Sequence, residues 1–122
     1  MVAKKSTLTL PSEHQEQVGF VQWFEGKFPL VRIFAIPNGE HRSMSVAKRL
    51  RAEGVRPGVP DMYVPEWGLW IEIKRQKGGR LSKDQIDWIE YLERAGQAVI
   101  VAHGAIDASK KVLSFLDGKV VN

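Results

Sequence analysis

The side chains best suited to chemistry in this sequence are two carboxylates and one lysine. Asp61 closes the segment Gly58-Val59-Pro60-Asp61, and eleven positions later Glu72-Ile73-Lys74 lies inside an apolar run. Two carboxylates can hold a divalent metal against a phosphodiester, and a lysine beside them can help to activate a water. The spacing therefore predicts hydrolytic chemistry, provided that the fold brings these residues together.

Strand geometry decides whether they meet. Side chains alternate in direction along a strand, so Glu72 and Lys74 share one face. If residues 61–64 pair antiparallel with residues 69–74, Asp61 lies near Glu72. Two carboxylates at that distance repel each other unless a cation sits between them. Hard cations prefer oxygen ligands, so Mg²⁺ or Mn²⁺ is the predicted cofactor.

The backbone carbonyl of Ile73 is a candidate for an extra metal ligand, and Lys74 is expected to steady the attacking water or the charged phosphate. The alternative is a Glu72–Lys74 ion pair on the surface, with Asp61 merely opening a strand. As a bare pattern these residues are common, and the spacing alone leaves both interpretations open.

Two glutamates in the first predicted helix are further candidates. Glu13 continues the stripe of Phe20 and Phe24, which predicts a carboxylate that points toward the sheet and not toward water. Its alternative role is to compensate the helix dipole. Glu16 follows a different face and is expected to be solvated, so we keep it as the reserve ligand.

Gln85 shares a helix face with Trp88 and Leu92. Together with Ser82 it fits a capping box, which explains the glutamine without any function. A glutamine beside a metal could also orient a phosphate or a ligand water, and both interpretations stay open.

Basic residues flank the acidic pair on both sides. Such runs are often only solvated faces, but cations around a metal-binding acidic pair are also what a phosphodiester-cutting site needs. The residues predicted to bind DNA are Asn38, His41, Arg42, Lys48, Arg51, Arg56, Arg75, Lys77 and Arg80.

The composition excludes several classes of site. The chain has 122 residues, a formal charge of +4 and no cysteine, so a disulfide framework, a thiolate zinc site and a cysteine nucleophile are impossible. No segment resembles a signal peptide or a membrane span, which predicts a soluble protein of the cytoplasm with no membrane partner.

Periodicity and turn residues predict an α/β fold in the order α-β-α-β-β-α-β-α, with a mixed β-sheet flanked by helices. We expect one domain over residues 12–117, with polar tails at 1–11 and 118–122. The expected helices are 12–26, 45–53, 82–94 and 105–116, and the expected strands are 31–36, 61–64, 69–74 and 98–102. Val46, Ala47 and Leu50 are expected to face inward from the second helix, and Ile86, Ile89 and Leu92 from the third.

With these residues assembled, the chain resembles a stand-alone VRR-NUC domain of the PD-(D/E)xK nuclease superfamily, with a restriction-endonuclease-like core. The resemblance covers residues 12–116, and the last motif that supports it ends at Gly96. It depends on the ordered occurrence of Ser12-Glu13-His14-Gln15-Glu16-Gln17, Ile36-Pro37-Asn38-Gly39, Arg56-Pro57-Gly58-Val59-Pro60-Asp61, Gly68-Leu69-Trp70-Ile71-Glu72-Ile73-Lys74-Arg75, and Gly79-Arg80-Leu81-Ser82 with Gln85.

The resemblance implies a metal-dependent DNA nuclease. It assigns Asp61 and Glu72 as metal ligands, Lys74 as the catalytic lysine, Glu13 as an accessory ligand and Gln85 as a supporting residue. Stand-alone members are similar to Holliday-junction resolvases that act as homodimers, often in phages and bacteria. Branched DNA and a second copy of the chain are therefore the expected partners.

Three functions compete at this point. The first is a structure-selective endonuclease for junctions or flaps, and the second is a restriction-type or end-processing nuclease built on the same core. The third is a non-catalytic nucleic-acid binding module, which would tolerate the loss of Asp61 or Lys74.

Overall fold

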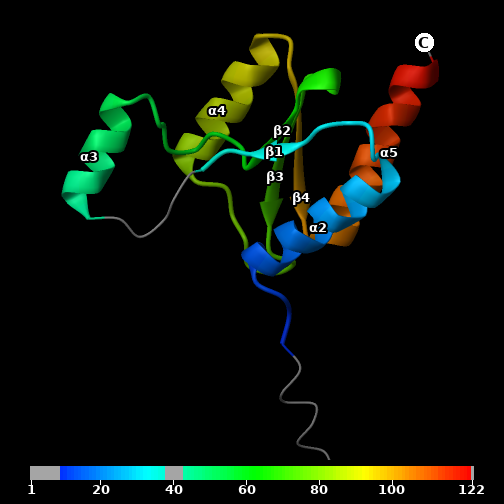
Figure 1. The fold of residues 1–122 in the computed structure, drawn as a ribbon, viewed down its shortest axis with the longest axis horizontal. Coiled ribbons are helices and arrows are strands. Elements are labelled where there is room, and N and C mark those ends of the chain that lie inside the picture. Colours follow the sequence, from blue (N-terminus) through cyan, green and yellow to red (C-terminus); the bar gives the residue numbers. More distant parts are fainter. Residues whose placement is uncertain (1–8, 38–42, 122) are drawn as a thin grey trace, which may run out of the picture. The chain divides into compact units, whose positions relative to one another are not determined.

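The computed structural model of the protein describes residues 9–37 and 43–121. Along the chain the elements are α2 (Glu13–Lys27), β1 (Phe34–Ala35), α3 (Met44–Ala52), β2 (Met62–Val64), the 3₁₀ helix η1 (Pro65–Trp67), β3 (Leu69–Lys74), α4 (Lys83–Arg94), β4 (Ala98–His103) and α5 (Ala105–Val121) (Figure 1). The predicted α/β class and the predicted order of helices and strands are confirmed. None of the described helices is long and apolar enough to cross a membrane.

The strands form one four-stranded mixed sheet in the order β1-β2-β3-β4. The chain groups into two compact units, one comprising Met1–Pro29, Ile73–Arg80 and Val101–Asn122 and the other Leu30–Glu72 and Leu81–Ile100. We call them the first and the second unit, and each is described by itself.

In the second unit, the β2–β3 hairpin supplies the core. Its residues pair antiparallel, with Met62 opposite Ile71 and Val64 opposite Leu69, and these four apolar side chains are fully buried. The hairpin closes through η1 and Gly68, whose φ of 57° lies in the left-handed region that favours glycine. The hairpin expected from the sequence is confirmed.

The first strand is shorter than predicted, since only Phe34 and Ala35 of residues 31–36 form β1. Strand β1 pairs antiparallel with β2, which has only three residues. Both side chains of β1 are exposed. The β-branched run at residues 31–36 is therefore longer than the strand with which it pairs, β2.

The helices of the second unit contribute fewer buried side chains than predicted. No side chain of α3 is buried, and Ala47 is exposed although it was expected to face inward. In α4, Leu92 is buried, but Ile86 is 43% exposed, which corrects the expected core face. Gln85, Ile89 and Leu92 follow the spacing of one helix face, and Ile86 lies about 100° away from Gln85 around the axis.

In the first unit, α2 packs against α5. Phe20 and Phe24 of α2 are completely buried, as are Ala108 and Val112 of α5. Helix α5 continues to Val121 and so extends beyond the end expected at residue 116.

Candidate metal centre

The register of the β2–β3 hairpin brings the two central carboxylates together in the second unit. Tyr63 lies opposite Trp70 and Met62 opposite Ile71, so the next position along each strand sets Asp61 opposite Glu72. On its other side, the Asp61 carbonyl accepts from the Ile36 backbone N–H at 2.7 Å, so the pairing of β2 with the β1 segment also extends to this position. Directly opposite residues on antiparallel strands have Cβ atoms about 5 Å apart, close enough for two carboxylates to share one cation.

Burial makes this carboxylate pair unusual. Glu72 lies between the buried residues Ile71 and Ile73 of β3 and is itself only 2% exposed. Asp61 is half-buried at the entrance of β2. Placing two acids side by side with little access to water is costly unless positive charge accompanies them. The arrangement therefore fits a cation-binding pair better than a solvated surface pair.

Gln85 belongs to this group of side chains through α4. The capping box predicted from the sequence is confirmed: the Ser82 hydroxyl accepts from the Gln85 N–H at 3.1 Å, and the Gln85 Oε1 accepts from the Ser82 N–H at 2.8 Å. The remaining end of the glutamine donates from Nε2 to Glu72 Oε2 at 3.0 Å. The capping interpretation is therefore confirmed, and the same amide also contacts the glutamate. Orientation of a phosphate or a ligand water by Gln85 stays a prediction.

The turn that leads to Asp61 is fixed against the same helix. Gly58 has a φ of +91°, and a Cβ atom there would lie 2.6 Å from the Asp84 carbonyl carbon. The turn can therefore approach the first turn of α4 only with glycine at this position. This close approach explains why the Gly-Val-Pro-Asp segment requires its glycine.

In the first unit, Lys74 lies near Glu13. The lysine is 7% exposed, and its Nζ lies 3.9 Å from Glu13 Oε2. The backbone at Lys74 is secured by the end of β4, since the Gly104 N–H donates to the Lys74 carbonyl at 2.8 Å. Gly79 also lies close, because a Cβ atom there would be 2.9 Å from the Lys74 Cβ. A largely buried ammonium beside a carboxylate suits a group that must hold positive charge at a fixed place.

The two glutamates of α2 differ from the sequence prediction. Glu13, expected to point away from water, has a side chain that is 46% exposed. Glu16, expected to be solvated, is 5% exposed. The reason is spacing: Glu16, Phe20 and Phe24 recur every four residues and form the buried face.

Glu16 also has a structural task. Its Oε1 accepts from the Ala105 N–H at 2.9 Å, and its Oε2 accepts from Gln76 Nε2 at 2.8 Å. Ala105 is the first residue of α5, so Glu16 caps that helix from a distant part of the chain. Both carboxylate oxygens thus have structural partners, which argues against the reserve role as a metal ligand.

Glu72 and Lys74 are joined by Ile73 within β3, and all three are buried. Asp61, Glu72 and Gln85 are brought together in the second unit, and Lys74 and Glu13 in the first. Among the described residues, no three His, Asp or Glu side chains form a ready-made metal cluster. The carbonyl of Ile73 stays a predicted ligand.

The predicted DNA-binding residues divide into three groups. Asn38, His41 and Arg42 lie outside the described residues. Arg56 donates to the Arg51 carbonyl at 2.7 Å, and Arg75 donates to the carbonyls of Lys77 and Gly78 at 2.9 and 3.3 Å, so both guanidinium groups support local turns. The remaining members of the set, which are also exposed, are Lys48, Arg51, Lys77 and Arg80.

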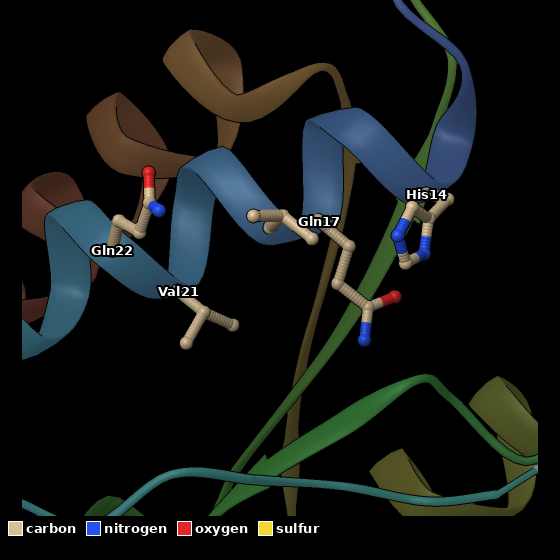
Figure 2. A pocket seen from close by; sticks show the side chains of 5 residues that line it. His14, Gln17, Val21 and Gln22 are labelled. Atoms are coloured by element: carbon tan, nitrogen blue, oxygen red, sulfur yellow. The ribbon is translucent and has the colours of Figure 1, made fainter.

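Helix α2 also lines a hollow of about 280 Å³, which no sequence motif indicated. Its lining side chains are His14, Gln17, Val18, Val21 and Gln22. Figure 2 shows them along α2, with Gln17 and Val21 pointing the same way. The first lining residue, His14, follows Glu13 in the sequence. The lining mixes polar and apolar side chains and does not indicate a particular kind of ligand.

Comparison with known proteins identifies a family and a fold. The family model of the VRR-NUC domain matches residues 9–106. Among solved structures, the chain is similar to a protein described as a VRR_NUC domain protein, with a TM-score of 0.67 and 20% sequence identity over 89% of this chain and 91% of that chain. At this identity the likeness establishes the shared fold. A search of curated proteins finds no match.

Proposed function

This chain belongs to the VRR-NUC domain family, whose domain implies a nuclease-type function, and we propose that it is a metal-dependent, structure-selective DNA endonuclease. The proposal includes a preference for branched DNA, similar to that of a Holliday-junction resolvase, and action as a dimer. The single observation that carries it is the register of β2 and β3, which sets Asp61 opposite Glu72.

The donor set of this site fits Mg²⁺ or Mn²⁺. Two carboxylates and the Ile73 carbonyl offer only oxygen ligands, and magnesium is commonly held by one or two carboxylates together with substrate phosphate. When bound, such a cation would neutralise charge on the phosphate and make a water easier to deprotonate.

The protein's own residues position the reacting groups. Gln85 holds one oxygen of Glu72, which fixes the direction of the carboxylate toward its ligand. Lys74 supplies a fixed positive charge for the phosphate as negative charge develops on it. Glu13 lies within ion-pair distance of Lys74, where it restrains the ammonium or serves as the accessory ligand.

The charge of the chain supports DNA as the substrate. The formal charge of +4 is accompanied by exposed cations in α3 and in the connection between β3 and α4. Such cations draw in the phosphate backbone and leave the carboxylates to the metal. Two symmetric cuts in a four-way junction require two active sites related by a two-fold axis, which is the reason to propose a homodimer.

The test is cleavage of labelled four-way junction, flap, linear duplex and single-stranded DNA, each with Mg²⁺, Mn²⁺ or EDTA. Symmetric nicks in the junction support the proposal. Degradation from duplex ends would instead support the end-processing alternative on the same core. Binding without products under every metal condition would leave only the non-catalytic module.

The matched variants are Asp61→Ala and Lys74→Ala, with Asp87→Ala as a control because Asp87 is an exposed acid of α4. We expect the first two to abolish cleavage while DNA binding persists, since separate cations supply the affinity. Circular dichroism checks that each variant is folded. Full cleavage by folded Asp61→Ala and Lys74→Ala proteins would end the enzyme hypothesis.

A further inference from the structure

Helix α3 is an amphipathic helix with no fully buried side chain. All nine of its residues are described, and none of them is buried. Its first residue, Met44, is 87% exposed. Burying such a methionine would be favourable, but a single exposed apolar side chain is common on protein surfaces, so its meaning depends on the side chains around it.

The exposed methionine shares a helix face with two cations. Met44, Lys48 and Arg51 stand four and three residues apart, the spacing of neighbours on one side of a helix. Together with Ser45 and Ala47 they line a hollow of about 690 Å³. The face therefore presents one apolar tip and two flanking positive charges beside a concave surface.

The charge around α3 points to an anionic partner. Residues 43–56 contain the four cations Lys48, Arg49, Arg51 and Arg56 and the single acid Glu53. Arg56 is used internally, because it donates to the Arg51 carbonyl and so caps the end of the helix. Lys48 and Arg51 remain as the cations that line the hollow.

We infer that α3 meets branched DNA at its branch point, with Met44 wedged against an opened base step and with Lys48 and Arg51 on the flanking phosphates. Apolar wedges accompanied by cations are a known way for proteins to hold distorted DNA. A helix of nine residues is about 14 Å long, so it spans roughly four base pairs. One methionine is too small a patch for a stable protein interface, which buries on the order of 1,000 Å² or more.

The connection from α3 to Asp61 makes the wedge useful for catalysis. The chain passes from α3 through Pro57, Gly58 and Pro60, where two proline rings restrict the backbone. Gly58 lies directly against Asp84 of α4. Within the second unit, a short connection with two prolines therefore joins the wedge to Asp61, which limits how far a bound branch point can lie from the carboxylate pair. The inference rests on the proposed function and specifies how that function selects its substrate.

The experiment measures binding in EDTA, so that cleavage does not interfere. Fluorescence anisotropy compares a four-way junction with a linear duplex of the same length, for the whole chain and for Met44→Ala. We expect Met44→Ala to bind the junction roughly tenfold more weakly and the duplex within about twofold of the original protein. Ile106→Ala is the matched control, since Ile106 is 73% exposed on α5, and it is expected to change neither affinity.

A second pair of measurements tests the binding of phosphates by the two cations. The double variant Lys48→Ala/Arg51→Ala should weaken binding to both DNAs and reduce the slope of log K against log salt by roughly 0.9 for each phosphate that is no longer neutralised. Lys110→Ala removes an exposed helical lysine of α5 and should leave the slope unchanged. A junction labelled with 2-aminopurine at the branch should brighten with the original protein and not with Met44→Ala.

Unchanged junction affinity in Met44→Ala would overturn the inference. A change of oligomeric state in Met44→Ala, seen by light scattering with DNA binding intact, would also overturn it and identify a protein interface. Failure of the nuclease proposal looks different: the original protein would bind junctions through Met44 and yet cut no DNA with Mg²⁺ or Mn²⁺. If Met44→Ala cleaved junctions with full activity, the nuclease proposal would stand and the proposed role of Met44 at the branch point would be wrong.

Discussion

Gln85 donates its side-chain N–H to Glu72 Oε2 at 3.0 Å while its carbonyl oxygen accepts from the Ser82 N–H at 2.8 Å. The second bond fixes which end of the amide faces the glutamate, because only the NH₂ group is left to point there. The same amide group thus caps the helix and orients the carboxylate. The start of α4 therefore sets the direction of Glu72.

Removing this amide should impair activity more than stability. We expect Gln85→Ala to lower the cleavage rate or the apparent metal affinity by about 10- to 100-fold, as is typical when a partner of a metal ligand is removed. Ser82→Ala is the matched control, since it removes the cap, at about 1 kcal/mol, and retains the amide. Metal-dependent cleavage and thermal unfolding are measured for both. Equal activity losses in the two variants would mean that Gln85 acts only through the helix cap.

Gly58 and Gly54 offer a comparison of two glycines with similar backbone. Their φ values are +91° and +102°, but a Cβ atom at Gly58 meets the Asp84 backbone at 2.6 Å, while one at Gly54 has nothing within 4 Å. We expect Gly54→Ala to cost about 1 kcal/mol of stability and Gly58→Ala at least about 2 kcal/mol more, because a steric overlap adds to the strained φ. Denaturant unfolding measures the difference. Similar costs for both would show that the turn can move away from α4.

Glu16 is predicted to be structural. Glu16→Ala leaves the Ala105 N–H at the start of α5 without its acceptor, and we expect it to lower the free energy of unfolding by about 2–3 kcal/mol. Glu25→Ala removes an exposed acid of the same helix and should change stability by less than about 0.5 kcal/mol. Mn²⁺ affinity, measured under conditions in which the variant is folded, should be unchanged. A loss of Mn²⁺ binding in folded Glu16→Ala would restore it as a ligand.

Asp107 gives a prediction for pH. Desolvation raises the pKa of its carboxyl, but hydrogen bonds from the His103 backbone N–H and from Lys111 outweigh that effect, so the pKa lies below the ordinary value for an aspartate. A lowered carboxyl pKa means that the charged form stabilises the fold above the unfolded-state pKa, and this stability is lost as the pH falls through the folded-state pKa.

Asp107→Asn should therefore reduce the unfolding midpoint in urea at pH 7, and the difference from the original protein should shrink as the pH falls toward about 3. Asp117→Asn, an exposed acid of the same helix, serves as the control. A difference that stays constant with pH would show that the stabilisation does not depend on the charge of Asp107.

The sequence predicted those features that depend on local pattern. The bounds of β3, the antiparallel hairpin and the Ser82–Gln85 capping box are all as expected, because alternation, turn residues and caps act over a few residues. The register of the hairpin is enough to place Asp61 opposite Glu72.

What the sequence did not predict depends on distant partners. Glu16 is buried because the start of α5 needs an acceptor, and nothing within α2 reveals that demand. Ala47 is exposed because none of the described elements buries α3, and β1 is short because β2 is short. Periodicity shows which side chains share a face, but it does not show whether another part of the chain covers that face.

Asp61 and Glu72 are predicted to bind one divalent cation between them. Isothermal titration calorimetry with Mn²⁺ tests it directly on the original protein, Asp61→Asn and Glu72→Gln, with Asp87→Asn as an exposed control and circular dichroism as the check of folding. We predict that Asp87→Asn binds Mn²⁺ normally and that each of the other two variants binds at least about tenfold more weakly. Normal Mn²⁺ affinity in folded Asp61→Asn and Glu72→Gln would contradict the claim.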